Sequence, residues 1–386
     1  MILRELKGRV RGQVLEDPVS RDRYSLAECI YRIAPRGAVL PACREDVLEV
    51  LALARREAIP VTARGAGSAV AGQTLGSGII LDFSRGMNRV LEVNRAERWV
   101  RVEPGVVLDD LNRMLADQGL RFGPDPASGD QCTVGGMIAN NSGGPHSIRH
   151  GATRDRVLSL TAALSGGGVM ETRPLARSEL APGSRDEQVR IARRLAEIVD
   201  GRREAIRAVT PRVARSSSGY DLLGSAGEER VDLARILSGS EGTLALVVEA
   251  RLELAPLPGA VATALVHFAG LEAMGEGVLR ALGGGVSALE ALDRSFLDLV
   301  REAGRDDARS LPAETEAVML ATTLLPNNLV LLEWPESASG FQLQSARAPD
   351  LTEWTPVSAL PSSNGGFQQV LVDTGGSTLC FRLKKL

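Results

Sequence analysis

The first 120 residues alternate between short apolar runs and stretches whose apolar residues recur every three or four positions. The run from Ala38 to Pro41 predicts a short strand. Residues 44–58 carry one apolar face at helical spacing and acidic residues in the first turn, which predicts an amphipathic helix. The apolar run from Ile59 to Ala63 then predicts a second strand, so this region forms a β-α-β unit.

Further apolar segments continue this alternation. Residues 78–83, 89–93 and 99–103 predict strands, and residues 106–118 predict a second helix that ends at Gly119. Mixed strands and helices of this kind indicate an α+β or α/β domain.

A glycine-rich stretch, Arg64 to Gln73, lies between two of the predicted strands. Glycine lets the main chain approach a ligand closely, and successive N–H groups in such a loop form a concave site that suits phosphate. The alternative is a flexible connection between two strands. The stretch lacks the Gly-x-Gly-x-x-Gly fingerprint, because Val70 takes the sixth position, and it joins strand to strand rather than strand to helix. A nicotinamide-binding domain is therefore disfavoured.

Two later stretches share this turn-rich character. Residues 123–144 combine prolines, paired glycines and short hydrogen-bonding side chains, and residues 236–248 place a turn with one carboxylate, Glu241, before a buried strand. An ordinary turn-rich loop is the alternative for the first, and a capping or turn role is the alternative for Glu241. Two glycine-rich loops separated by β-rich segments are harder to explain as turns, and they suggest a ligand with more than one polar portion.

Composition narrows the functional classes. The chain has 386 residues, which suits two or three domains, and a formal net charge of −3, which gives no support for nucleic-acid binding as its main task. No run reaches the roughly 18 apolar residues of a membrane helix, and the N-terminus lacks the apolar segment of a signal peptide, so a cytoplasmic location is expected. The cysteines lack metal-ligand or redox spacing, and the glycines and proline around His146 and His150 argue against a helix there, so no metal is predicted.

Together the turn-rich stretches resemble one family, the FAD-linked oxidases of the vanillyl-alcohol oxidase and p-cresol methylhydroxylase type (PCMH-type). The chain is most similar to the branch that contains the D-lactate, glycolate and D-2-hydroxyglutarate dehydrogenases. The resemblance covers roughly residues 20–320, and the order and spacing of the motifs make it specific. Those motifs are Pro41 with Glu45–Val47, Arg64–Gln73, Pro124–Ser128 with Cys132–Gly143, Ser217–Leu222 and Gly239–Leu244.

The resemblance implies an α+β fold in which a PCMH-type FAD-binding domain of two α+β subdomains is followed by a cap. We expect an N-terminal lead-in over residues 1–37, the FAD-binding domain over residues 38–258 and a partial α/β cap over residues 259–326. Residues 327–386 change character, because aromatic residues and short apolar runs separated by Pro, Ser, Asn and Gly predict a small antiparallel β tail. Its aromatic side chains are expected to form a core rather than a binding surface.

The resemblance also implies which residues hold FAD. The glycine-rich loop would cradle the pyrophosphate, the second stretch would line the cofactor, and the third would hold its adenosine or ring end. Some relatives tether FAD through a histidine beside the first loop, but Gly67-Ser68 takes that place here, so non-covalent FAD is expected. The expected cofactor-binding residues are Arg64, Gly65, Ala66, Gly67, Ser68, Gly72, Gln73, Pro124, Ala127, Ser128, Thr133, Gly135, Gly136, Asn140, Ser142, Glu241, Gly242 and Val248.

The family reaction transfers hydride from the hydroxyl-bearing carbon of a 2-hydroxy acid to the flavin. It needs a base for the hydroxyl proton and a cation or metal for the carboxylate. No histidine occurs beyond His267, so the metal-binding and base motif of the family has no counterpart and catalytic residues are not assigned. Arg215 and Tyr220 are substrate-side candidates from the loop resemblance, and the alternatives are a surface cation and a packing residue.

These features predict an FAD-dependent dehydrogenase that oxidises a 2-hydroxy acid such as D-lactate, glycolate or D-2-hydroxyglutarate, with an electron acceptor or partner subunit. One alternative is an FAD-binding protein with an incomplete cap and no turnover, acting as a binding module or subunit. A second alternative is a scaffold that residues 327–386 recruit to a surface or partner.

Overall fold

The computed structural model describes residues 2–213, 216–304, 314–325, 329–335, 341–347, 353–359, 361–364, 367–373 and 379–385. The chain divides into two compact units. Unit 1 comprises Met1–Gly144 and His150–Pro256, and unit 2 comprises Pro145–Arg149 and Leu257–Leu386. In the part of the chain that is described, no helix has the length and apolar character needed to cross a membrane.

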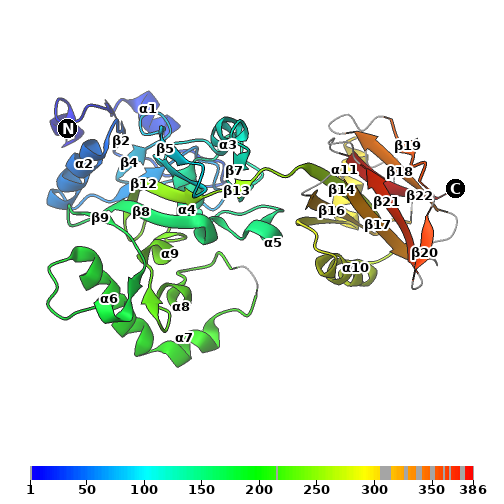
Figure 1. Cartoon of the computed structure of the whole chain (residues 1–386). Helices are drawn as coiled ribbons and strands as arrows, with labels where there is room; N and C mark the ends of the chain where they lie inside the picture. The colour runs from blue at the N-terminus through cyan, green and yellow to red at the C-terminus, as the bar shows by residue number, and fades with distance from the viewer. Residues whose placement is uncertain are drawn as a thin grey trace. The chain divides into compact units, whose positions relative to one another are not determined.

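The first sheet of unit 1 has four strands in the order β1-β2-β4-β3, of which β2 and β4 are labelled in Figure 1. β2, β4 and β3 run parallel, and β1 is antiparallel to β2. Helix α2 contributes Val47 and Val50 to the same buried cluster as Ile79 of β4, and each fully buried side chain of this size contributes about 1.5–3 kcal/mol. The predicted β-α-β unit is confirmed, with bounds β1 Gln13–Leu15, β2 Gly37–Leu40, α2 Arg44–Arg56, β3 Val61–Arg64 and β4 Ile79–Asp82.

The second sheet of unit 1 is antiparallel and has the order β5-β6-β12-β8-β9. Its central strand β12 alternates between buried and half-buried positions, so one face of the sheet packs on the main core. That core also holds Leu111, Phe122 and Ile138. The bounds are β5 Val90–Asn94, β6 Trp99–Val102, α3 Leu108–Ala116, β8 Val157–Ala163, β9 Val169–Glu171 and β12 Leu246–Glu253.

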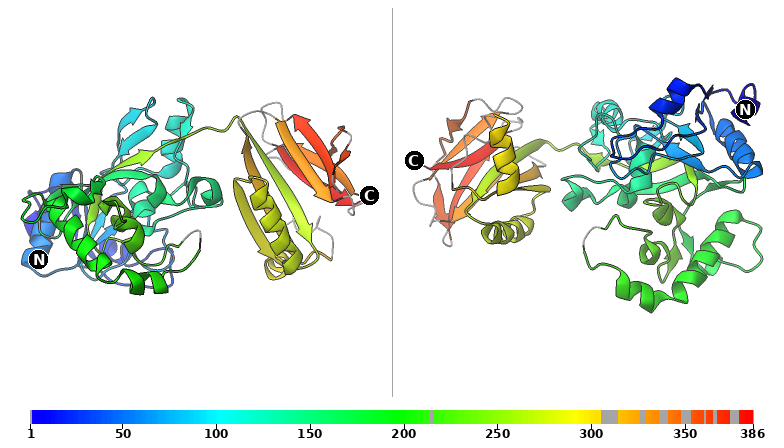
Figure 2. Two further views of the ribbon diagram at one scale, coloured as in Figure 1. Left: turned by 60° about the horizontal axis from the view of Figure 1, so that its bottom comes forward. Right: turned by 180° about the vertical axis from the view of Figure 1, so that it is seen from behind.

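Shorter elements complete unit 1. The helices α6 and α7, green in Figure 2, are rich in charged residues. The bounds are η1 Ile2–Leu6, α1 Pro18–Arg23, β7 Leu120–Arg121, α4 Val134–Asn140, η2 Thr153–Arg156, β10 Leu175–Ala176, η3 Arg177–Glu179, α6 Glu187–Asp200, α7 Arg203–Val209, α8 Leu222–Ser225, β11 Arg230–Val231, α9 Leu233–Leu237 and β13 Ala255–Pro256. The helix α5, Ser147–His150, spans the residues where the two units divide.

Unit 2 contains a six-stranded sheet, β15-β16-β14-β22-β18-β19, and a three-stranded sheet, β17-β21-β20. α10 packs against β14 and β16, and α11 packs against β15. The bounds are β14 Ala260–Phe268, α10 Leu271–Gly283, β15 Ala288–Asp293, α11 Arg294–Glu302, β16 Ala317–Leu325, β17 Leu329–Pro335, β18 Phe341–Arg347, β19 Thr355–Pro356, β20 Ser362–Asn364, β21 Phe367–Asp373 and β22 Leu379–Lys385.

The predicted cap and the predicted tail contribute strands to the same sheet of unit 2. The strand β22 lies between β14 and β18, parallel to β14 and antiparallel to β18. The antiparallel pairing expected for the tail is confirmed for β17–β21, β20–β21 and β18–β22, whereas the β14–β22 pair is parallel. Phe381 is buried in a cluster with Ala262 and Leu343, as expected for a core aromatic. The side chains of Trp334, Phe341 and Phe367 lie outside the described residues.

Two local expectations are wrong. Residues 134–140 form the helix α4 within the turn-rich stretch, because Thr133 caps the helix by accepting a hydrogen bond from the Gly136 N–H at 3.3 Å. Ser147–His150 form a single helical turn where glycine and proline argued against a helix, since one turn fits between Pro145 and Gly151.

Candidate functional site

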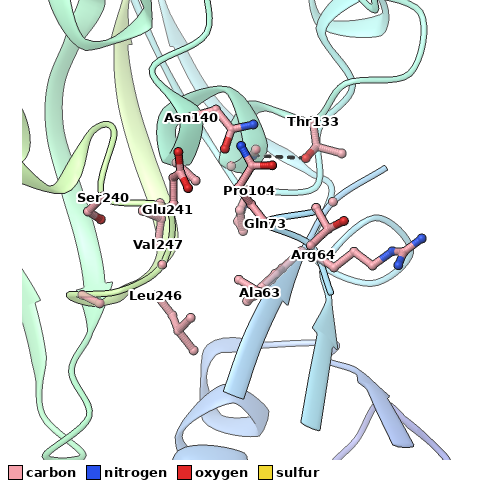
Figure 3. Close-up of a pocket in the computed structure, with 18 of the residues that line it drawn as sticks. Ala63, Arg64, Gln73, Pro104, Thr133, Asn140, Ser240, Glu241, Leu246 and Val247 are labelled. Atoms are coloured by element: carbon pink, nitrogen blue, oxygen red, sulfur yellow. Dashed lines mark hydrogen bonds between the residues drawn. The ribbon is translucent and has the colours of Figure 1, made fainter. Parts of the chain in front are cut away.

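One pocket of unit 1 is lined by segments that are distant in the sequence (Figure 3). They include the end of β3 with the glycine-rich loop, the helix α4 with its capping residue Thr133, and the turn that leads into β12. The lining residues are Ala63, Arg64, Gly65, Gln73, Thr74, Phe83, Pro104, Thr133, Gly135, Gly136, Ala139, Asn140, Leu237, Ser240, Glu241, Gly242, Ala245, Leu246 and Val247.

Glycines let the loop and the helix approach each other closely. A Cβ atom on Gly65 would lie 2.1 Å from Oγ1 of Thr133, the residue that caps α4. A Cβ atom on Gly135 would lie 2.6 Å from Cβ of Pro104, whose carbonyl oxygen accepts a hydrogen bond from the Gly135 N–H at 2.7 Å. Any larger residue at position 65 or 135 would therefore push the walls of the pocket apart.

The turn at residues 239–242 is held on the end of α4 by its main chain. The Gly239 N–H donates to the Ile138 carbonyl oxygen at 2.8 Å, and the Glu241 N–H donates to the Ala139 carbonyl oxygen at 3.0 Å. The φ angle of Glu241 is 52°, a left-handed conformation that is uncommon for residues other than glycine. The surrounding hydrogen bonds hold this conformation, which brings Glu241 and Gly242 to the pocket wall.

A buried arginine, Arg154, donates a hydrogen bond to the residue before the same turn. Arg154 is 8% exposed, and its Nε donates to the Ser238 carbonyl oxygen at 2.8 Å. Its guanidinium lies 3.8 Å from the Asp221 carboxylate and so close to Gly239 that a Cβ there would meet Nη2 at 2.4 Å. Burial lowers the pKa of Arg154, and Asp221 acts in the opposite direction.

Two buried polar atoms of the pocket have no hydrogen-bond partner among the residues that the structure describes. These atoms are Gln73 Oε1 and Thr74 Oγ1. A buried polar atom without a partner is costly, and such atoms are found where a ligand or water completes the bond. Unsatisfied acceptors and hydroxyls beside a glycine-lined wall fit a ligand that is long and has several polar groups, as FAD is.

The guanidinium of Arg64 does not take part in the pocket wall. Figure 3 shows it directed away from the other lining residues. Its Nη1 donates to the Leu26 carbonyl oxygen at 2.8 Å. Burial lowers the pKa of Arg64, while Asp82 and Tyr24 act in the opposite direction.

The pocket brings together about half of the residues expected to bind the cofactor. Those that line it are Arg64, Gly65, Gln73, Thr133, Gly135, Gly136, Asn140, Glu241 and Gly242. Those outside its lining are Ala66, Gly67, Ser68, Gly72, Pro124, Ala127, Ser128, Ser142 and Val248.

Of the two expected substrate-side residues, Tyr220 does not line the pocket, and Arg215 is not among the described residues. Tyr220 is 44% exposed, and its hydroxyl lies 2.8 Å from Oγ1 of Thr243.

Some lining residues have no signal in the sequence. In the sequence, four of them are ordinary residues at the ends or in the middle of strands, and their position in the pocket depends on which segments pack together. They are Pro104, Phe83, Leu246 and Val247. Thr74 directly follows Gln73, the last residue of the glycine-rich loop, and this position is the one sequence feature that points to Thr74 as a lining residue.

Comparisons with known proteins show which proteins this chain resembles. Residues 35–173 match the FAD binding domain family. The D-2-hydroxyglutarate dehydrogenase of Pseudomonas putida is 39% identical over 257 residues, which make up 64% of this chain and 25% of the relative. The D-2-hydroxyglutarate dehydrogenase of Escherichia coli is 36% identical over 298 residues, 75% of this chain and 29% of the relative. The glycolate oxidase subunit GlcD of Bacillus subtilis is 26% identical over 294 residues, 75% of this chain and 52% of the relative.

The chain therefore spans between a quarter and about half of the length of these relatives. Among solved structures, an alkyldihydroxyacetonephosphate synthase superimposes with a TM-score of 0.61 at 19% identity, over 84% of this chain and 56% of the other. That likeness shows a shared fold. Residues 35–173 are thus similar to the FAD binding domain family, and the chain is similar to D-2-hydroxyglutarate dehydrogenases and to a glycolate oxidase subunit.

Proposed function

We propose that the chain is an FAD-dependent dehydrogenase that oxidises a 2-hydroxy acid, with D-2-hydroxyglutarate as the first candidate, and glycolate and D-lactate as the others. The observation that carries the proposal is the pocket itself. Its close-packed glycines lie in the segments that match the FAD binding domain family, as do Gln73 Oε1 and Thr74 Oγ1, which have no partner among the described residues. The names of the relatives support the substrate class.

The residues of the chain hold and orient the cofactor. The main chain around Gly65, the side chains of Gln73 and Thr74, and the turn at Glu241 and Gly242 would contact FAD. FAD, when bound, supplies the hydride acceptor, and the protein supplies position and a pocket shielded from water. Gly67 and Ser68 stand where some relatives carry a tethering histidine, so we propose non-covalent binding.

Anaerobic reduction tests this function most directly. Purified protein is reconstituted with FAD without oxygen, and the visible absorbance of the oxidised flavin is followed after addition of each acid. Bleaching by D-2-hydroxyglutarate, glycolate or D-lactate, with the matching L-2-hydroxyglutarate or L-lactate as control, is the expected result. Protein that takes up no FAD contradicts the proposal at its first step.

The second candidate is an FAD-binding subunit without turnover of its own. The observation in its favour is that the three histidines of the chain are His146, His150 and His267, so the long segment after residue 267 offers no histidine as a base. This candidate predicts bound flavin that none of the acids bleaches.

A further inference from the structure

A segment near the N-terminus lies along the glycine-rich loop. We call residues 24–31 the strap. The Glu28 N–H donates to the Gly67 carbonyl oxygen at 3.0 Å. The ring of Tyr31 covers Gly72 so closely that a Cβ there would lie 2.9 Å from the ring. The strap thus contacts the loop at two glycines whose φ angles, 83° and 87°, are left-handed.

Arg64 is the third and most specific link between the strap and the loop. It is the last residue of β3, and its Nη1 donates to the Leu26 carbonyl oxygen at 2.8 Å. Its guanidinium lies beneath Gly67, where an added Cβ would lie 2.6 Å from Nη2. One side chain therefore contacts the main chain of both the strap and the loop.

The strap is itself anchored in the core. Tyr24 is 6% exposed, and its hydroxyl donates to the Asp82 carboxylate at 2.6 Å. Asp82 ends β4 and is the strand partner of Arg64. The guanidinium of Arg64 also lies over the Tyr24 ring, 5.4 Å from its centre. These contacts fix the direction of Arg64 away from the pocket, as Figure 3 shows.

We propose that Arg64 is a positioning residue for the FAD site, and that it acts by holding the glycine-rich loop on the strap. The cofactor would contact the loop from the pocket side while Arg64 supports it from the opposite side. Binding FAD and ordering the strap are then coupled, because both require the same loop conformation. The inference depends on the FAD binding of the proposed function.

The alternative role for Arg64 is direct contact with the cofactor phosphates. Arginine is well suited to phosphate, but here the guanidinium would have to leave Leu26 and Tyr24 to reach the pocket. The two roles make opposite predictions for the strap. A positioning role keeps the strap on the loop when FAD binds, and a phosphate-binding role releases it.

Hydrogen exchange on the unmodified protein separates these roles. FAD is expected to slow amide exchange in residues 24–31 together with residues 65–73, and the Glu28 N–H is the most informative single amide because it bonds to Gly67. Unchanged or faster exchange in the strap, with FAD bound, overturns the proposal. Protein that binds no FAD overturns the proposed function as well, so the two failures are distinguishable.

Three variants extend the test. Arg64→Met is expected to weaken FAD binding at least about tenfold in a flavin fluorescence titration, because a charged hydrogen bond and the contact with Gly67 are lost. Arg64→Lys keeps one donor and should recover part of the affinity. Arg21→Met is the matched control, because Arg21 Nε donates to the Pro35 carbonyl oxygen at 2.9 Å, beyond the strap. Equal FAD affinity of Arg64→Met and the unmodified protein overturns the proposal.

Discussion

At the scale of single residues, Thr74 places a buried hydroxyl in the lining of the pocket. Its hydroxyl is buried and has no hydrogen-bond partner among the described residues. We expect Thr74→Val to stabilise the FAD-free protein by about 1 kcal/mol, because an unsatisfied buried polar group is removed, and to weaken FAD binding. Urea unfolding without FAD and a flavin titration measure the two effects. A variant that loses stability and keeps full FAD affinity would contradict this role.

Gly65 tests the close approach of the loop and α4. The substitution Gly65→Ala places a methyl group 2.1 Å from Oγ1 of Thr133. We expect a loss of about 1–3 kcal/mol of stability, as for other overpacked sites, together with weaker FAD binding. Gly168→Ala is the control, because a Cβ there meets nothing within 4 Å. The melting temperature and a flavin titration are measured for both variants. Equal losses of stability and of FAD affinity in Gly65→Ala and Gly168→Ala would refute the steric argument.

Sequence reasoning at this scale finds main-chain roles more readily than side-chain directions. The glycine-rich loop implies that its main chain approaches a neighbouring group closely, and Gly65 lies against Thr133 in this way. The same loop begins with Arg64, whose guanidinium direction depends on Tyr24 and Leu26, 40 and 38 residues earlier, so the order of residues alone does not reveal it.

At the scale of elements, the start of α2 carries a pH-dependent contribution to stability. The Asp46 carboxylate accepts hydrogen bonds from the N–H groups of Arg11 at 2.8 Å, Gly12 at 2.9 Å and Ala42 at 2.8 Å. Burial raises the pKa of Asp46, but these hydrogen bonds lower it more, so its pKa is below the ordinary value.

A lowered pKa in the folded state means stability that is present above the unfolded pKa, near 4, and lost as the pH falls through the folded pKa. We therefore expect Asp46→Asn to cost about 2 kcal/mol or more near pH 6 and less at pH 3. Urea unfolding of both proteins at several pH values checks it. If the difference in unfolding free energy between the two proteins grew towards acidic pH, the pKa of Asp46 would be raised by folding and not lowered.

The turn at residues 239–242 depends on Arg154. We expect Arg154→Met to destabilise the protein by about 2–3 kcal/mol, because the Ser238 carbonyl oxygen loses its donor and the buried guanidinium no longer pairs with the half-buried Asp221. Arg235→Met is the control, since Arg235 pairs with the same carboxylate at 2.8 Å from a more exposed position. We expect that control to cost at most about 1 kcal/mol. Thermal melts compare the two variants, and equal losses would argue against a special role for the buried guanidinium.

The elements that the sequence predicts well are those with their own periodic apolar face. The stripe of α2 and the alternation of β12 identify them without tertiary information. Helix α4 is different, because it has seven residues, two of them glycine, and its capping residue Thr133 is recognisable only once the helix is known.

At the scale of the whole molecule, the pocket lies entirely in unit 1. We therefore expect FAD to raise the melting temperature of one calorimetric transition, that of unit 1, by an amount that grows with ligand concentration. At a hundredfold excess over Kd the stabilisation is about 2.7 kcal/mol. Differential scanning calorimetry with and without FAD measures it, and an equal shift of both transitions would contradict binding confined to unit 1.

The resemblance to a family depends on the order of several weak motifs, so it predicts the fold of unit 1 better than any one motif. Unit 2 resists the same reasoning. Its separation into a cap and a tail follows a change of composition near residue 327, whereas its sheet is defined by the pairing of β14 with β22, more than a hundred positions apart. Composition carries no information about such distant pairing.

The position of β22 also sets an order of events during synthesis on the ribosome. All the strands of unit 1 lie before residue 257, so that unit can complete its sheets while later residues are still being added. The six-stranded sheet of unit 2 cannot, because its fourth strand, Leu379–Lys385, is the last to be made, and β14 must wait for it with one edge unpaired. A nascent chain stalled before residue 379 would therefore expose that edge to other chains.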